Sequence, residues 1–128
     1  MRLGTVLFEG RERVVADISN ARMLDLASAA EMRGHDVNPF VDMLALINSG
    51  DDALSTARDL VSDPENRAIL SEEDVTFRPP IMPVQYRDCL VFEEHLKGAF
   101  AQAEKMTGRA FDIPKVWYKQ PIYYKGNR

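Results

Sequence analysis

The pattern of hydrophobic and polar residues changes from a strand-like to a helix-like period early in the chain. Residues 3–8 and 13–18 are rich in β-branched and aliphatic side chains, and the polar stretch 9–12 between them contains a glycine. This arrangement predicts two strands joined by a turn. Residues 23–33 then repeat Leu, Ala and Met at helical spacing and stop before Gly34, which predicts a helix.

The next forty residues predict two further helices. Asn38-Pro39 offers a cap and a proline at the first helical position, and apolar residues recur from there to Gly50. Asp51 can cap a third helix, which ends at Ser62-Asp63-Pro64 because the residue before a proline disfavours helical backbone. An acidic connector, residues 71–74, follows.

The second half of the chain has a different residue pattern, with many prolines and aromatic residues. Residues 75–77 predict a strand, and residues 78–83 contain three prolines, which suit neither a helix nor a central strand. A helix is predicted from Asp88, as its N-cap, to about Met106, closed by Thr107-Gly108. Residues 111–128 are aromatic, β-prone and interrupted by two prolines.

These elements predict an α/β (more loosely α+β) protein with two parts. We place a small N-terminal α/β module in residues 1–73 and the start of a second domain in residues 74–128. The aromatic ending needs a surface to pack on, and the other strong strand signals lie in the first module. We therefore expect either a second chain to supply the missing sheet or a longer protein of which these residues are the front part, and we favour the longer protein.

Composition and charge narrow the class of protein. The 128 residues carry a formal net charge of −4, which gives no general case for nucleic-acid binding. Residues 105–128 hold six basic residues against Asp112, a net charge of +5, which could attract an anionic substrate or simply be solvated. Cys89 is the only cysteine, so no internal disulfide forms. No apolar run is long enough to span a membrane and no signal peptide is present, so a cytoplasmic location is expected.

Asp88 and His95 are the candidate chemical groups. On the predicted helix they are seven residues apart, nearly two turns, and therefore lie on the same face. An acid and an imidazole facing one way can form a reaction site, because histidine is a suitable base near neutral pH. The same two residues can also be an N-cap and a surface histidine, and spacing does not decide between these interpretations.

The run from residue 77 to residue 127 resembles the fumarylacetoacetate hydrolase family. The likeness lies in several short motifs in the same order: Phe77-Arg78-Pro79-Pro80, Arg87-Asp88 with Phe92-Glu93-x-His95, Pro114-x-x-Trp117-Tyr118, and Pro121-x-x-Tyr124-x-Gly126. The first module also resembles the small N-terminal domain that many members carry. The resemblance implies that the second domain begins a mixed β-sandwich roll.

The resemblance also implies roles for three residues. Asp88 matches an aspartate of the metal and substrate site, His95 matches the catalytic histidine, and Tyr124 matches a tyrosine near the substrate. The implied ion is Mg²⁺ (or Ca²⁺ or Mn²⁺), and its main ligands, a Glu-x-Glu pair and a further aspartate, are expected downstream of this segment. One departure is Cys89-Leu90, which replaces the aromatic pair that many members have after the aspartate.

The function so implied is metal-dependent cleavage of a C–C bond in an acylpyruvate or related β-dicarbonyl acid. The expected partners are a small anionic keto-acid substrate and a second copy of the chain in a homodimer, with no nucleic acid and no membrane. Related members act as isomerases, decarboxylases or dehydratases, and the sequence does not choose among these. The alternative from another class is a complete but inactive interaction module or accessory subunit.

Overall fold

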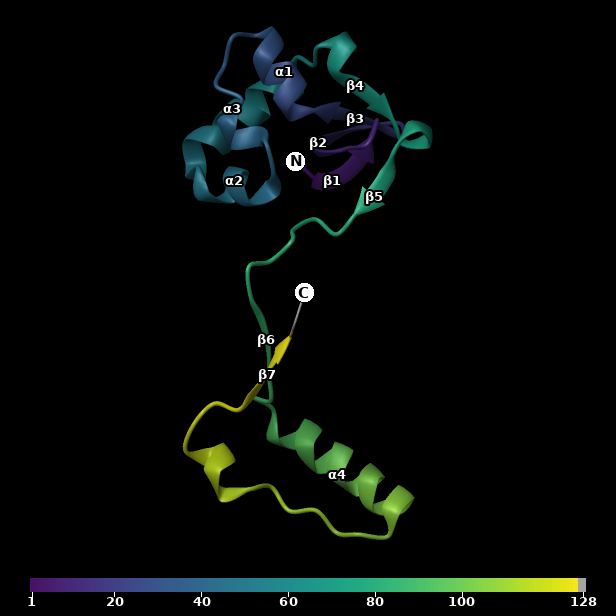
Figure 1. The fold of residues 1–128 in the computed structure, drawn as a ribbon, viewed down its shortest axis with the longest axis vertical. Helices are drawn as coiled ribbons and strands as arrows, with labels where there is room; N and C mark the ends of the chain where they lie inside the picture. Colours follow the sequence, from purple (N-terminus) through teal and green to yellow (C-terminus); the bar gives the residue numbers. More distant parts are fainter. Residues whose placement is uncertain (127–128) are drawn as a thin grey trace. The chain divides into compact units, whose positions relative to one another are not determined.

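The computed structural model describes residues 1–126 and divides into two units, Met1–Met82 and Pro83–Arg128. Each unit is a separate assembly of strands and helices (Figure 1). The chain is therefore of mixed α+β class, which agrees with the coarse fold class expected from the hydrophobic pattern.

The first unit opens with the predicted hairpin. Strands β1 (Leu3–Phe8) and β2 (Arg11–Ser19) are antiparallel, with Phe8 opposite Arg11. The turn is shorter than predicted, since Glu9 and Gly10 alone connect the strands with φ of 48° and 76°. Two positive φ values in a two-residue loop match the right-handed twist of the flanking strands.

The helix predicted over residues 23–33 begins later than expected. Strand β3 (Arg22–Asp25) pairs with β2, and only then does α1 (Leu26–Met32) start. The Asp25 carboxylate caps α1 by accepting hydrogen bonds from the backbone N–H groups of Ala27 and Ser28, at 3.1 and 3.2 Å. Leu24 suits a strand as well as a helix, and its pairing with β2 decides in favour of the strand.

The two following helices are present with altered starts. Asn38–Phe40 is a single 3-10 turn, and the α-helix after it, α2 (Met43–Asn48), is capped by Asp42 instead of Asn38. The third helix, α3 (Gly50–Ser62), ends at the predicted position before Pro64. Figure 1 shows α1, α2 and α3 gathered on one side of the sheet.

The last two strands of this unit close the sheet. Strand β4 (Ile69–Ser71) pairs with β3, and β5 (Thr76–Arg78) pairs with β1, giving the order β4-β3-β2-β1-β5. Five Cα steps, including a short 3-10 turn over Glu72–Asp74, join these opposite edges. They span at most about 18 Å, whereas four strand spacings of a flat sheet require about 19 Å. The sheet must therefore curl.

Pairing of β5 with β1 places the residues after 73 in the first unit. The division between the units follows Met82, not the acidic connector at which we predicted it. The acidic connector is polar and short, which suggested a linker, yet it crosses the curled sheet and its Glu72 N–H donates to the Ala21 carbonyl at 2.8 Å.

Both faces of the curled sheet carry buried apolar side chains. On the helical face, buried side chains from β2 and β3 pack with those of the helices, among them Val14, Leu24, Phe40 and Leu60. The opposite face buries a smaller cluster: Val6, Val15 and Met23, with Leu70 and Val75 against it. Neighbouring residues of β2 thus point to opposite cores, as the period-2 alternation of a strand requires.

The turn between β2 and β3 is strained. Ser19, Asn20 and Ala21 all adopt positive φ, at 80°, 57° and 56°. Left-handed backbone costs an L-residue about 1–2 kcal/mol, and only glycine adopts it readily.

Replacing Ala21 by glycine is expected to raise the free energy of unfolding by about 0.5–1 kcal/mol, since relief of the left-handed strain exceeds the added chain entropy. Urea denaturation followed by circular dichroism measures this. The matched control is Ala27→Gly in α1, which is expected to lower stability by about 1 kcal/mol. Equal destabilisation by both changes would contradict the strain at Ala21.

The second unit corrects the prediction around Asp88. Strand β6 (Tyr86–Cys89) contains Asp88 and pairs with β7 (Tyr123–Gly126), and helix α4 (Glu93–Thr107) begins only after it. Asp88 is therefore not an N-cap and does not share a helix face with His95. The predicted end is confirmed, since Gly108 takes left-handed backbone with φ of 69° and its N–H donates to the Glu104 carbonyl at 2.8 Å.

The aromatic ending finds its partner within the same unit. Residues 115–118 form a 3-10 helix, η4 (Lys115–Tyr118), and β7 follows it to pair with β6. The sequence pattern does not reveal this partner, because it predicts a helix from Asp88 where the structure has strand β6. Asn127, the last residue of the resemblance, lies outside the described residues.

This unit buries little apolar surface. Leu96 is its one buried apolar side chain among the described residues, at 5% exposure. Cys89, the single cysteine of the chain, is exposed. No helix within residues 1–126 is long and apolar enough to cross a membrane.

Candidate functional site

The β6–β7 ladder brings two of the three predicted site residues together. Asp88 is the register partner of Tyr124. Residues directly opposite in an antiparallel pair point to the same face, so their Cβ atoms are about 4.5–5.5 Å apart. Both side chains are exposed. A carboxylate and a phenol therefore stand next to each other although 36 residues separate them in the sequence.

His95 lies in the first turn of α4, close after β6 along the chain. It is the third residue of the helix and is exposed. Glu93 and Glu94 precede it, where carboxylates are favourable near the helix N-terminus. The predicted site residues thus come from a strand pair and from the start of the helix that follows it.

The structure gives a reason for the glycine at position 126, which is part of the motif Pro121-x-x-Tyr124-x-Gly126. A Cβ atom on Gly126 would lie 1.8 Å from the ring of Tyr86, its register partner across the ladder. The ring of Tyr86 thus covers a backbone position that has no side chain, an arrangement that pins the register of neighbouring strands. Any larger residue at 126 requires the Tyr86 ring to move, and Tyr86 shares the face that carries Asp88 and Tyr124.

A second group of residues at this site has no counterpart in our sequence-based list. The Trp117 indole N–H donates to the Leu90 carbonyl at 2.7 Å. The Tyr118 hydroxyl donates to Glu93 Oε1 at 2.9 Å. The motif Pro114-x-x-Trp117-Tyr118 was the available signal, but a motif does not reveal which distant backbone atom an indole reaches.

The shifted pKa values in the described part of the second unit belong to Glu93 and its two partners, Lys97 and Tyr118. A hydrogen bond from Lys97, with Nζ 3.0 Å from Glu93 Oε1, and a second bond from Tyr118 lower the pKa of Glu93 below its ordinary value of 4.5. The same contacts raise the pKa of Lys97, mainly through Glu93. The Glu93 carboxylate also raises the pKa of Tyr118 above 10.0, because ionising the phenol would remove the donated proton and place two anions together.

Two opposite pH dependences follow from these shifts. The lowered pKa of Glu93 means that its contribution to stability is present above the unfolded-state value and is lost as the pH falls through the folded-state pKa. The raised pKa of Tyr118 means that its contribution is present below pH 10 and is lost as the pH rises through the folded-state pKa.

The change Glu93→Gln is therefore expected to move the pKa of Tyr118 back towards 10.0, because the neutral amide no longer repels the phenolate. Absorbance at the tyrosinate band during alkaline titration measures it. Subtracting the titration of Tyr118→Phe isolates the signal of this residue from the other three tyrosines. An unchanged Tyr118 titration in the glutamine variant would exclude the contact with Glu93 in solution.

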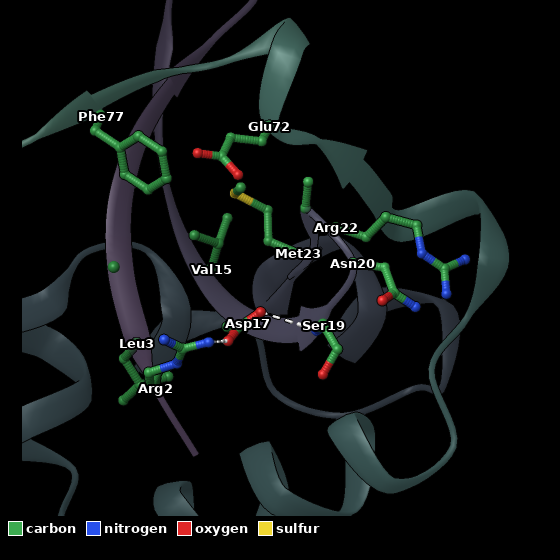
Figure 2. A pocket seen from close by; sticks show the side chains of 12 residues that line it. Arg2, Leu3, Val15, Asp17, Ser19, Asn20, Arg22, Met23, Glu72 and Phe77 are labelled. Carbon is green, nitrogen blue, oxygen red and sulfur yellow. Dashed lines mark hydrogen bonds and ion pairs between the residues drawn. The ribbon is translucent and has the colours of Figure 1, made fainter.

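The first unit has a hollow of about 460 Å³ on the sheet face away from the helices. Figure 2 shows Val15, Met23 and Phe77 in it, with Glu72 at one end and Asp17 at the other. Asp17 is satisfied within the protein: it accepts from the Ser19 N–H at 2.9 Å and pairs with Arg2. These bonds, the Ser19 bond first, lower its pKa. None of the three predicted site residues lines this hollow.

Comparison with known proteins adds no assignment. No known protein-family model matches this chain, and no curated protein matches it. What is established for residues 1–126 is a mixed α+β protein, with an antiparallel five-stranded sheet in the first unit and a two-stranded ladder with one α-helix in the second.

Proposed function

We propose that this chain carries part of the site of a hydrolase of the fumarylacetoacetate hydrolase type, which cleaves a C–C bond in an acylpyruvate or related β-dicarbonyl acid. The observation that supports it best is the register of β6 and β7, which sets Asp88 opposite Tyr124. Asp88 lies in β6, the strand that precedes the helix of His95. In the proposal the enzyme is cytoplasmic and homodimeric and takes a small anionic keto acid.

The proposed role of His95 is that of general base. Its imidazole accepts a proton from the water that attacks the acyl carbonyl, a contribution worth roughly 10²–10⁴-fold in rate. The C–C bond then breaks, and its electron pair stays with the pyruvyl fragment as an enolate. Protonation of that enolate gives pyruvate, and the acyl fragment leaves as a carboxylic acid. Tyr124 would donate a hydrogen bond to a substrate oxygen.

The metal implied by the resemblance is not accounted for by the described residues. Mg²⁺ takes about six oxygen ligands, and Ca²⁺ six to eight. Residues 1–126 contain no group of three or more His, Cys, Asp or Glu side chains that could hold an ion. Asp88 supplies one carboxylate, so in this proposal most ligands of Mg²⁺ (or Ca²⁺ or Mn²⁺) lie outside the described residues, and no step above depends on the ion.

The test is an assay of acylpyruvate hydrolysis by protein expressed from its complete coding sequence, with Mg²⁺ or Mn²⁺ and with a chelator. We expect pyruvate and the free acid in equal amounts. Release of CO₂ or formation of an isomer would instead identify the decarboxylase or isomerase chemistry of related members. Absence of any turnover of β-dicarbonyl acids by the metal-loaded protein would overturn the proposal.

The exposed apolar side chains of the second unit favour one alternative, an interaction module or accessory subunit. Phe92, Met106 and Tyr124 are 74%, 79% and 67% exposed, and Leu96 is the one buried apolar side chain among the described residues of this unit, so a partner would cover apolar surface that the unit leaves open. In that alternative the aromatic segment 111–124 is the docking element. A stable complex with another protein, together with no hydrolysis, would favour it over the enzyme.

A further inference from the structure

The link between Asp88 and His95 is an exposed junction. After Leu90, only Val91 and Phe92 separate the strand pair from the first residue of α4. These two side chains are 59% and 74% exposed, so they have little packing to hold the helix at one angle to the strand. The position of His95 relative to Asp88 therefore depends on contacts made at the two ends of this junction.

Trp117 holds the strand end of the junction. Its indole Nε1–H donates to the Leu90 carbonyl at 2.7 Å, while the Leu90 N–H donates to the Ile122 carbonyl at 3.0 Å. The backbone of Leu90 is thereby bonded on both its polar groups. Trp117 is partly buried, which shields its bond from competition by water.

Tyr118 holds the helix end of the junction. Its hydroxyl donates to Glu93 Oε1 at 2.9 Å, and Lys97 contacts the same oxygen at 3.0 Å. Glu93 is the first residue of α4 and lies two residues before His95. Fixing Glu93 to a point outside the helix sets the rotation of the first turn, and with it the direction of the His95 side chain.

Both contacts come from one short element. Trp117 and Tyr118 are neighbours in η4, and their rings meet edge to face with centroids 4.9 Å apart. The backbone of η4 is closed by bonds from the Trp117 N–H to the Pro114 carbonyl and from the Lys119 N–H to the Val116 carbonyl, at 2.9 and 3.0 Å. A single short turn thus bonds to the backbone before the junction and to the side chain after it.

We propose that Trp117 and Tyr118 are positioning residues that set the place of His95 relative to Asp88. The catalytic meaning of this inference rests on the proposed function, whereas the geometric part does not. Neither residue touches substrate in this proposal. They act through Leu90 and Glu93, and a misplacement of about 1 Å at a reacting group can lower a rate by about 10²-fold.

The test compares Trp117→Phe and Tyr118→Phe with the unchanged protein. Each keeps an aromatic ring and removes one donor. The first readout is the imidazole resonances of His95 in a proton–carbon correlation spectrum, assigned with His35→Gln because the chain has two histidines. We expect the His95 resonances to shift or broaden in both variants and those of His35 to stay in place.

The second readout is acylpyruvate hydrolysis, in which we expect kcat to fall about 10- to 100-fold with little change in KM. The matched control is Phe111→Leu, which weakens the ring contact with Phe100 at 6.0 Å, further along α4 from His95. It reports general loosening of the second unit and is expected to leave the His95 resonances unchanged.

Unchanged His95 resonances in both donor-deletion variants, or the same perturbation in Phe111→Leu, would overturn the positioning role. If Trp117→Phe does not fold, Tyr118→Phe decides, because it removes only a hydroxyl from an exposed side chain. If the protein without substitutions has no hydrolytic activity, the proposed function is refuted. The His95 resonances then still decide whether Trp117 and Tyr118 set the position of His95. An active protein whose kcat is unaffected by both changes would refute the positioning role alone.

Discussion

Replacing His95 by alanine is expected to lower kcat/KM for acylpyruvate hydrolysis by about 10²- to 10⁴-fold, the usual contribution of a general base. The expected loss of stability is small, because His95 is exposed and its loss empties no core position. Steady-state kinetics with Mg²⁺, together with a urea denaturation curve of the same variant, measures both quantities.

The matched control for His95 is His35, the other histidine of the chain. It is exposed, lies in the first unit after α1, and takes no part in the proposed reaction. We expect His35→Ala to retain normal kinetics. If the unsubstituted protein is active, near-normal turnover in the His95→Ala variant would remove this residue from the mechanism.

Asp25→Ala is expected to lower the free energy of unfolding of the first unit by about 2–4 kcal/mol. Asp25 is 3% exposed and caps α1 through two backbone bonds, and its Oδ2 also accepts from the Ser28 hydroxyl at 2.7 Å. The same oxygen lies 3.6 Å from the guanidinium of Arg13. Alanine would uncap the helix and leave a half-buried guanidinium without its carboxylate.

The control for the stability loss in Asp25→Ala is the variant Asp42→Ala. Asp42 caps α2 through one bond to the Ala45 N–H at 2.8 Å and is exposed, so its loss is expected to cost about 1 kcal/mol. Asp25→Asn preserves the capping oxygen and removes the charge, and should fall between the two. Chemical denaturation of the three variants orders them, and an Asp25→Ala cost no larger than that of Asp42→Ala would disprove the combined role.

Local signals predicted several elements well. The first hairpin follows from two β-branched runs around a glycine, and the end of α4 follows from Gly108, whose positive φ few other residues tolerate. The third helix ends before Pro64 for an equally local reason. Each of these predictions depends on residues close together in the sequence, which is why sequence reasoning could make them.

The errors share one cause. The sequence pattern predicts helices over residues 23–33 and from Asp88, yet residues 22–25 and 86–89 are strands. Such short segments are decided by their ladder partners, and the partner of Asp88 is Tyr124 at the far end of the chain. The boundary predicted after residue 73 was misplaced for the same reason, since β5 pairs with β1.

The sequence by itself determined the α+β character of the protein, its first hairpin, the ends of its longer helices, and three candidate residues: Asp88, His95 and Tyr124. Only the tertiary structure decided which of these residues stand together, because strand pairing between distant segments sets Asp88 opposite Tyr124. It also decided that η4 bonds to both sides of the junction before His95. Such contacts depend on which distant segments of the chain pack together, and the spacing of residues along the sequence does not show this.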